Sequence, residues 1–214
     1  MTQLRLLLPA VALGVCGALS GCSGLLRSAA PALQLYVLQA PVLQIAPRPA
    51  LASLRITRPL PGPGLNTDRI ALLRTDNRLD YYAGSRWSAP LSDVLADLQL
   101  ALFQTDPHWS AVADDRSSFN ADYLLQTSID RFAAEYAADA GSPPQVRVVL
   151  HCLLIRRSDG SLLGSFAVSE SQPAQENRMA SVVAAFSAAA GRATTTVVEQ
   201  SDALLRSAKP PAVP

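Results

Sequence analysis

Apolar and polar residues alternate in several short segments of the chain, a pattern that predicts β-strands. Within residues 51–58, Leu54 and Ile56 alternate with polar neighbours, as in a strand that buries one face. Residues 146–155 are apolar on both faces, which predicts a strand at the centre of a sheet. Shorter segments of strand-like composition lie at 33–38, 70–74, 79–82, 109–113, 123–132 and 162–169.

Two further segments have the three-to-four residue spacing of an amphipathic helix. The first begins at Pro90, which suits the first turn of a helix, and ends before Asp106-Pro107. The second is expected from about residue 173 to about residue 205, with a kink or break at Gly191.

Turn signals join neighbouring strands. Asp76-Asn77 separates two of the segments, and the sequence Ser-Asp-Gly-Ser at 158–161 separates two others. Tight turns require antiparallel pairing, and two amphipathic helices need a sheet face to cover. We therefore predict an α+β fold, an antiparallel sheet with two amphipathic helices packed on one face.

The N-terminal segment has the form of a lipoprotein signal. One positive charge at Arg5 precedes an apolar stretch that is too short to span a membrane and that ends in Leu19-Ser20-Gly21-Cys22, a lipobox. Cys22 is thus the expected lipid attachment site; the alternative is a coincidental cysteine near a signal peptide. Ser23 stands where aspartate commonly retains lipoproteins at the inner membrane, which favours a lipid-anchored protein on the periplasmic face of the outer membrane.

This interpretation divides the chain into four parts. They are a signal peptide (1–21), a lipidated tether (22–32), one α+β domain (33–206) and a disordered tail (207–214). Without Arg5, one of 18 basic residues, the mature chain has equal numbers of basic and acidic residues, which does not favour nucleic-acid binding. Cys16 is removed with the signal peptide, so Cys152 is the one unlipidated cysteine of the mature chain, and we expect no internal disulfide and a buried thiol.

The sequence offers little for catalysis. Its two histidines, His108 and His151, are far apart, and a His151–Cys152 dyad is geometrically poor because adjacent strand residues point to opposite faces. Common nucleophile, nucleotide-binding and metal-binding motifs are absent from the sequence. We therefore predict no catalytic residues, no metal site, no cofactor and no enzymatic activity.

Arginine and aromatic residues gather before the first helix. Because such residues often anchor protein interfaces, Arg69, Tyr82, Arg86 and Trp87 are candidate partner contacts. For Trp87 the favoured alternative is a core residue that packs under the first helix.

These residues, in their order along the chain, resemble the ABC-type transport auxiliary lipoprotein family. The resemblance rests on Tyr36-Val37-Leu38, Asp68-Arg69-Ile70 and Ile129-Asp130-Arg131-Phe132, and most specifically on Arg86-Trp87-Ser88-Ala89-Pro90-Leu91 after Leu79 and Tyr82. It covers nearly the whole mature chain. Ala89 and Ala133 stand where the family often has glutamate, which puts a local polar contact in doubt.

The resemblance implies a non-enzymatic accessory lipoprotein of an intermembrane system that transports lipids or other hydrophobic molecules. The implied partners are a mammalian-cell-entry (MCE) domain protein and an inner-membrane ABC permease and ATPase. The chain would act by protein docking, or would itself bind lipid in an apolar groove, and a homo-oligomer is left open. The rival hypotheses are a lipid-tethered periplasmic hydrolase and a structural envelope lipoprotein without a transport role.

Overall fold

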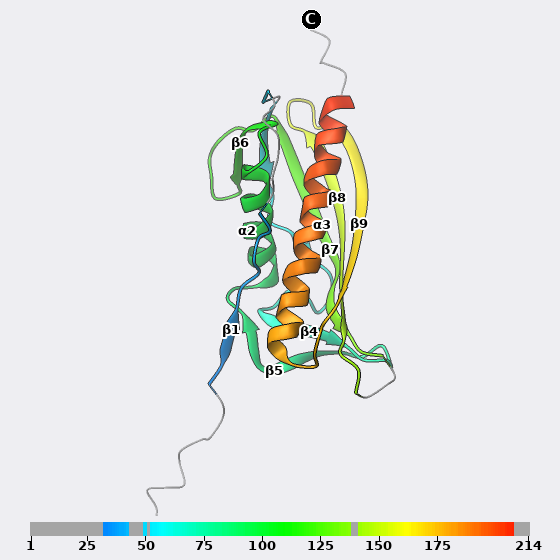
Figure 1. Ribbon diagram of the computed structural model, residues 1–214. Helices are drawn as coiled ribbons and strands as arrows, with labels where there is room; N and C mark the ends of the chain where they lie inside the picture. The colour runs from blue at the N-terminus through cyan, green and yellow to red at the C-terminus, as the bar shows by residue number, and fades with distance from the viewer. Residues whose placement is uncertain (1–31, 43–48, 51, 138–140, 208–214) are drawn as a thin grey trace, which may run out of the picture. The chain divides into compact units, whose positions relative to one another are not determined.

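The computed structural model describes residues 32–42, 49–50, 52–137 and 141–207. The chain divides into residues 1–32 and 33–214, and every element below lies in the second unit. In chain order the elements are β1 (Gln34–Tyr36), β2 (Ala52–Ile56), β3 (Leu60–Pro61), β4 (Arg69–Leu73), β5 (Leu79–Trp87), α2 (Leu91–Gln104), β6 (Trp109–Asp114), β7 (Tyr123–Glu135), β8 (Gln145–Arg156), β9 (Leu162–Pro173) and α3 (Met179–Ser207) (Figure 1).

The α+β class is confirmed, but the sheet is mixed and not purely antiparallel. Strands that follow each other directly in sequence through turns or a short loop are antiparallel as predicted: β4 with β5, β7 with β8, and β8 with β9. The remaining pairs are parallel, namely β1 with β5, β2 with β6, and β7 with each of β2, β3 and β4. The prediction failed because loops and a helix separate these strands in sequence, and such connections permit parallel pairing.

Strand β7 organises the sheet. Along one edge it pairs antiparallel with β8 from end to end. Along the other edge it pairs in turn with β2, β3 and β4, through Leu54, Leu60 and Leu72. Strand β3 was not predicted, since it lies in a proline- and glycine-rich loop. That loop is held to β7 by a hydrogen bond of 2.9 Å from the amide of Gly62 to the carbonyl oxygen of Ile129.

Strand β8 is central, as its apolar character on both faces predicted. It lies between β7 and β9. One face is fully buried, at Val146, Val148, Leu150, Cys152 and Leu154.

The two helices lie side by side, and α3 packs against β8 and β9 (Figure 1). Helix α2 begins directly after Pro90 and ends before Asp106-Pro107, as predicted. Helix α3 begins at Met179, later than predicted, because β9 continues as far as Pro173, which pairs with Gln145 of β8. Helix α3 is long and apolar enough to cross a membrane, but 56% of its most apolar window is buried inside the domain.

Helix α3 is continuous through Gly191, so the predicted break is absent. The glycine instead permits a close approach. A Cβ atom at residue 191 would lie 3.0 Å from Cδ of Pro41, in the segment that follows β1. Gly191 thus allows residues 39–41 to lie against α3.

Candidate functional site

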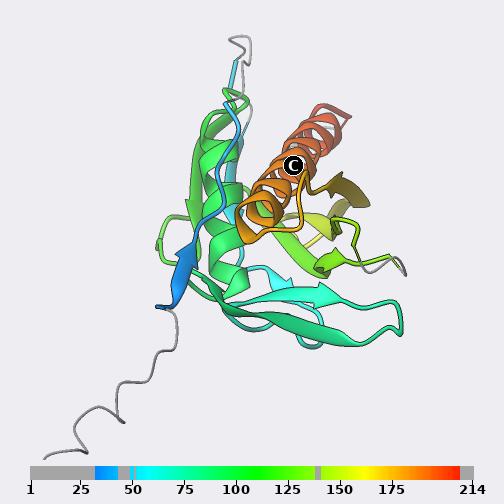
Figure 2. The same cartoon turned by 60° about the horizontal axis from the view of Figure 1, so that its bottom comes forward.

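The β4–β5 hairpin carries the candidate partner contacts. Arg69 begins β4, whereas Tyr82 and Arg86 lie in β5, and Figure 2 shows the two strands side by side. The hairpin turns at Asn77, whose φ of 58° belongs to the left-handed region that asparagine tolerates better than most residues. The turn signal in the sequence therefore located this hairpin correctly.

Arg69, which is exposed, and Tyr81, which is partly buried, form a pair on this hairpin. The guanidinium carbon of Arg69 lies 3.9 Å from the ring centroid of Tyr81, within the range of a cation–π interaction. The Tyr81 hydroxyl donates a hydrogen bond of 2.8 Å to the carbonyl oxygen of Gly64, which fixes the ring. Arg69 makes no ion pair with a carboxylate of the described residues. The pair thus offers a positive charge on a fixed aromatic support.

Tyr82 points to the opposite face of the hairpin and is half-buried. Its hydroxyl lies 2.9 Å from the hydroxyl of Tyr136, which donates to Oδ1 of Asn177 at 3.0 Å. Burial, followed by the contact with Tyr136, raises the pKa of Tyr82 far above its ordinary value. Tyr82 thus links β5 to the end of β7 and to the segment before α3.

Arg86 pairs with Asp68 across 2.8 Å, and both side chains are partly exposed. Backbone hydrogen bonds hold the same loop to the end of β5, from Trp87 N to Asp68 O (2.7 Å), and to the start of α2, from Leu91 N to Thr67 O (3.0 Å). Arg86 therefore helps to order the loop that presents Arg69.

Trp87 is a core residue, as in the favoured alternative, although its aromatic contacts are with β7 and α3. It is only 1% exposed, and its ring makes edge contacts with Phe132 (6.0 Å) and Phe186 (5.3 Å). The role of Trp87 as a surface contact for a partner is therefore corrected, because the folded domain does not offer its side chain to a partner. Of the four candidates, Arg69, Tyr82 and Arg86 keep exposed atoms at the hairpin.

The structure also assembles a buried cluster that the sequence analysis did not identify. Asp106 and His108 lie between α2 and β6, whereas Asp202 lies near the end of α3. Nδ1 of His108 is 2.8 Å from Oδ1 of Asp106 and 2.8 Å from Oδ2 of Asp202. All three residues are buried. Burial and the neighbouring Asp106 carboxylate raise the pKa of Asp202 to about 7, although His108 and Arg206 oppose this shift.

One signal in the sequence could have found part of this cluster. Asp202 follows Val198 by four residues, so it occupies the buried side of α3, where an apolar residue is expected. Its partners were out of reach of local reasoning because they lie almost half the chain away.

The other residues considered as candidates from the sequence do not form a site together. His151 is exposed, whereas Cys152 is buried on the other face of β8, so the geometric argument against a dyad is confirmed. Burial raises the pKa of the Cys152 thiol to about 11, opposed by a hydrogen bond to Thr127, which leaves the thiol unreactive at neutral pH. Cys22 lies outside the described residues.

Comparisons with known proteins identify relatives across the whole domain. A family model described as the ABC-type transport auxiliary lipoprotein component matches residues 36–198. The crystal structure of protein XCC0632 from Xanthomonas campestris is similar, with 25% sequence identity and a TM-score of 0.71 over 81% of this chain and 97% of that chain. A crystal structure of an uncharacterized protein shares the fold, with 14% identity and a TM-score of 0.63 over 79% of this chain and 98% of that chain. No curated protein matches the chain.

Proposed function

The chain belongs to the ABC-type transport auxiliary lipoprotein family, and from this premise we propose that it is the outer-membrane lipoprotein of an intermembrane transport system for lipids or other hydrophobic molecules. The family match carries this proposal, since it runs from β1 into the last third of α3. The lipobox at Cys22 supports a membrane anchor at the N-terminal end of the same domain.

The proposed role is docking without catalysis. The sequence has no P-loop, so the energy for transport is assigned to an ABC ATPase and permease of the inner membrane. An MCE-domain protein is the proposed periplasmic partner. Deletion of the gene should give the same envelope defect as deletion of the permease gene, and the double deletion should be no worse. An additive defect would contradict a shared transport system.

Membrane attachment is tested separately. Replacing Cys22 with Ala should leave the domain folded and move it from the membrane fraction to the soluble periplasmic fraction, because a triacylated cysteine supplies several chains at about 0.8 kcal/mol per buried methylene. Full membrane retention of the variant would contradict lipid anchoring at this residue.

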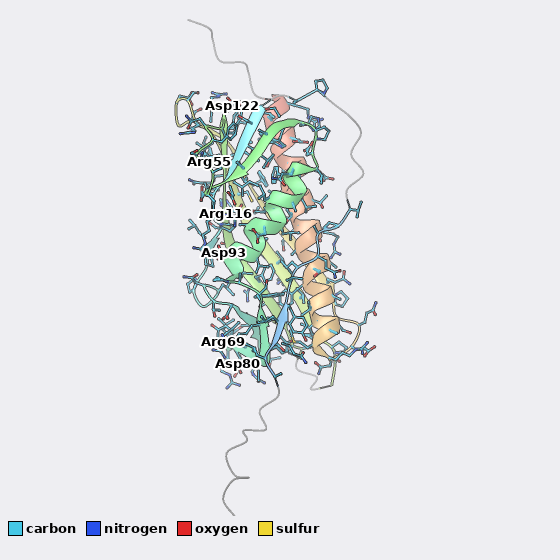
Figure 3. The ribbon with its side chains drawn as sticks, turned by 90° about the vertical axis from the view of Figure 1, so that its left-hand side faces the viewer. Arg55, Arg69, Asp80, Asp93, Arg116 and Asp122 are labelled. Atoms are coloured by element: carbon cyan, nitrogen blue, oxygen red, sulfur yellow. The ribbon has the colours of Figure 1, made fainter. Side chains whose placement is uncertain are left out.

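The Arg69–Tyr81 pair is the proposed centre of the docking surface. Arginine and tyrosine are enriched among interface residues that contribute most to binding, and here tyrosine fixes the arginine in place. Figure 3 shows Arg69 and Asp80 at one end of the domain and Arg55 and Asp122 toward the other, with Arg116 between them. A partner that presents an acidic or aromatic group would fit the end that carries Arg69.

Site-specific crosslinking tests this surface. A photo-crosslinking amino acid at position 69 should capture the MCE-domain protein in intact cells. The same amino acid at position 116 is the control, because the Arg116 side chain is 77% exposed and lies at the start of the loop after β6. Equal capture from both positions would contradict a docking surface centred on Arg69.

A second candidate function, lipid binding by the domain itself, is favoured by one groove. The groove has a volume of about 630 Å³ and lies between residues 39–41 and α3, where Ala184, Ala188 and Gly191 leave space. Native mass spectrometry should detect phospholipid on the purified protein. Ala188→Trp should abolish it by filling the groove, whereas lipid bound equally by this variant would count against the groove.

Two rival functions make different predictions. A lipid-tethered hydrolase would need one of its histidines, whereas docking would not need the exposed His151. Preserved function after His151→Ala would therefore leave a hydrolase dependent on the buried His108 alone. A structural envelope lipoprotein would show no genetic interaction with a permease or ATPase gene.

A further inference from the structure

Asp106, His108 and Asp202 form a compact set of ligand atoms inside the domain, and we propose that they bind a divalent transition-metal ion such as Zn²⁺. One ligand atom from each residue lies within 4.8 Å of the other two. Nδ1 of His108 faces a carboxylate oxygen of each aspartate at 2.8 Å. Carboxylate oxygens and imidazole nitrogens are donors that Zn²⁺ accepts in proteins.

The aspartate oxygens that do not face His108 support the proposal that the cluster binds an ion. The Asp106 side chain is 1% exposed and that of Asp202 is 10% exposed. Oδ2 of Asp106 and Oδ1 of Asp202 are buried, and no N–H or O–H group of the described residues donates a hydrogen bond to them. Buried polar atoms without a partner are few in native proteins, and they often mark the place of a bound water or ion.

Charge balance favours a divalent cation. The two aspartate carboxyl groups face a single imidazole in the interior, where an uncompensated charge is costly. A bound divalent ion would compensate the charges of both carboxylates. The nearby Arg206 is exposed and directs Nε to the backbone carbonyl of Asp202 at 3.3 Å, so it supplies only a screened charge.

The framework around the cluster is already ordered. The amide of His108 donates to Oδ1 of Asp106 at 3.0 Å, and the amide of Trp109 donates to the Asp106 carbonyl at 3.3 Å. Asp202 is fixed by its place within α3. These contacts hold the side chains in one geometry before an ion binds, which lowers the entropic cost of binding.

A bound ion would require a small adjustment. Donor atoms around a tetrahedral Zn²⁺ with bonds of about 2.0 Å are roughly 3.3 Å apart, so the pairs now at 2.8 Å would separate by about half an ångström. The ion would replace the hydrogen bonds between Nδ1 and the carboxylates. Three protein ligands would leave a fourth position for water.

The ion would join two distant parts of the chain, the connection before β6 and the end of α3. Since binding to the folded state alone stabilises that state by mass action, Zn²⁺ should raise the thermal stability of the protein. This consequence gives a readout that needs no knowledge of the transport partner or cargo.

The test uses the full chain, purified in detergent and stripped of metal with a chelator. Equilibrium dialysis against ZnCl₂ should give one bound ion per chain, together with a higher Tm. Co²⁺ should bind at the same site and give the visible absorption bands of a tetrahedral complex. Asp202→Asn and His108→Gln should each weaken Zn²⁺ binding tenfold or more, since each removes a ligand.

Asp97→Asn is the matched control, because the Asp97 side chain is 67% exposed on α2 and should leave binding unchanged. Three results would overturn the site. They are absence of stoichiometric Zn²⁺ binding by the wild-type chain, equal binding by the Asp202→Asn and wild-type chains, and a Zn²⁺-independent Tm.

Discussion

The hairpin end of the domain and the cluster at the end of α3 place their charged groups in opposite ways. At the hairpin, aromatic residues fill the interior, with Trp87 against Phe132 and Phe186, and charged groups such as Arg69 remain outside. At the end of α3, charged groups lie inside. Asp106 and Asp202 face His108 in a buried position, and each has one oxygen that receives no hydrogen bond from an N–H or O–H group in the part of the chain that the structure describes.

The difference separates residues that maintain the fold from residues available for binding. The charged groups at the hairpin are at least partly exposed, so they can change partners at little cost to stability. Polar groups in the cluster have left water, so each of them depends on the others. Substitutions should therefore change stability strongly in the core and the cluster and weakly at the hairpin surface.

Trp87→Ala should have the largest effect. Removing this fully buried side chain leaves a cavity between β5 and α3, and we expect a loss of about 4 kcal/mol in the free energy of unfolding. Urea denaturation of the purified domain measures it. Its neighbour Arg86 is the control, because loss of the partly exposed ion pair with Asp68 should cost about 1 kcal/mol or less. Equal losses of unfolding free energy from the two variants would contradict the difference between the core and the hairpin surface.

His108→Ala should have the second-largest effect on stability. The change removes the group that faces both buried carboxylates, and we expect a loss of about 3 kcal/mol in the metal-free protein. His151→Ala, at an exposed position of β8, should change stability by about 0.5 kcal/mol or less. Chemical denaturation in the presence of a chelator compares the two. An unaltered midpoint for His108→Ala would show that the cluster does not stabilise the fold.

Gly191→Leu should have a smaller effect. Because a Cβ atom alone would approach Pro41 to 3.0 Å, a larger side chain should displace residues 39–41 from α3, with a net cost of about 1 kcal/mol. Limited proteolysis should show faster cleavage in that segment. Ala203→Leu, at an exposed position of the same helix, controls for the added side chain and should leave the cleavage rate unchanged.

Arg69→Ala should affect stability least and binding most. The exposed cation–π contact with Tyr81 contributes about 0.5 kcal/mol, so the Tm should hardly move. Co-purification of the MCE-domain protein should nevertheless fall markedly. Arg116→Ala should change neither quantity, and a loss of partner with this variant as well would indicate a diffuse charge effect.

Local patterns in the sequence determined most of the secondary structure. Alternation or strand-like composition located every strand except β3, the turn at Asp76-Asn77 located the β4–β5 hairpin, and helical spacing located α2. The apolar run at 146–155 placed β8 at the centre of its sheet and Cys152 inside it. These features were predictable because each depends only on residues that are close together in the sequence.

The tertiary structure alone decided the rest. Parallel pairing of β2, β3 and β4 along β7 depends on how long connections cross the domain, and no local pattern records it. The same holds for the approach of Pro41 to Gly191. The meeting of Asp202 with His108 required α3 to lie beside α2, so residues remote in sequence acquired their chemistry only from the fold.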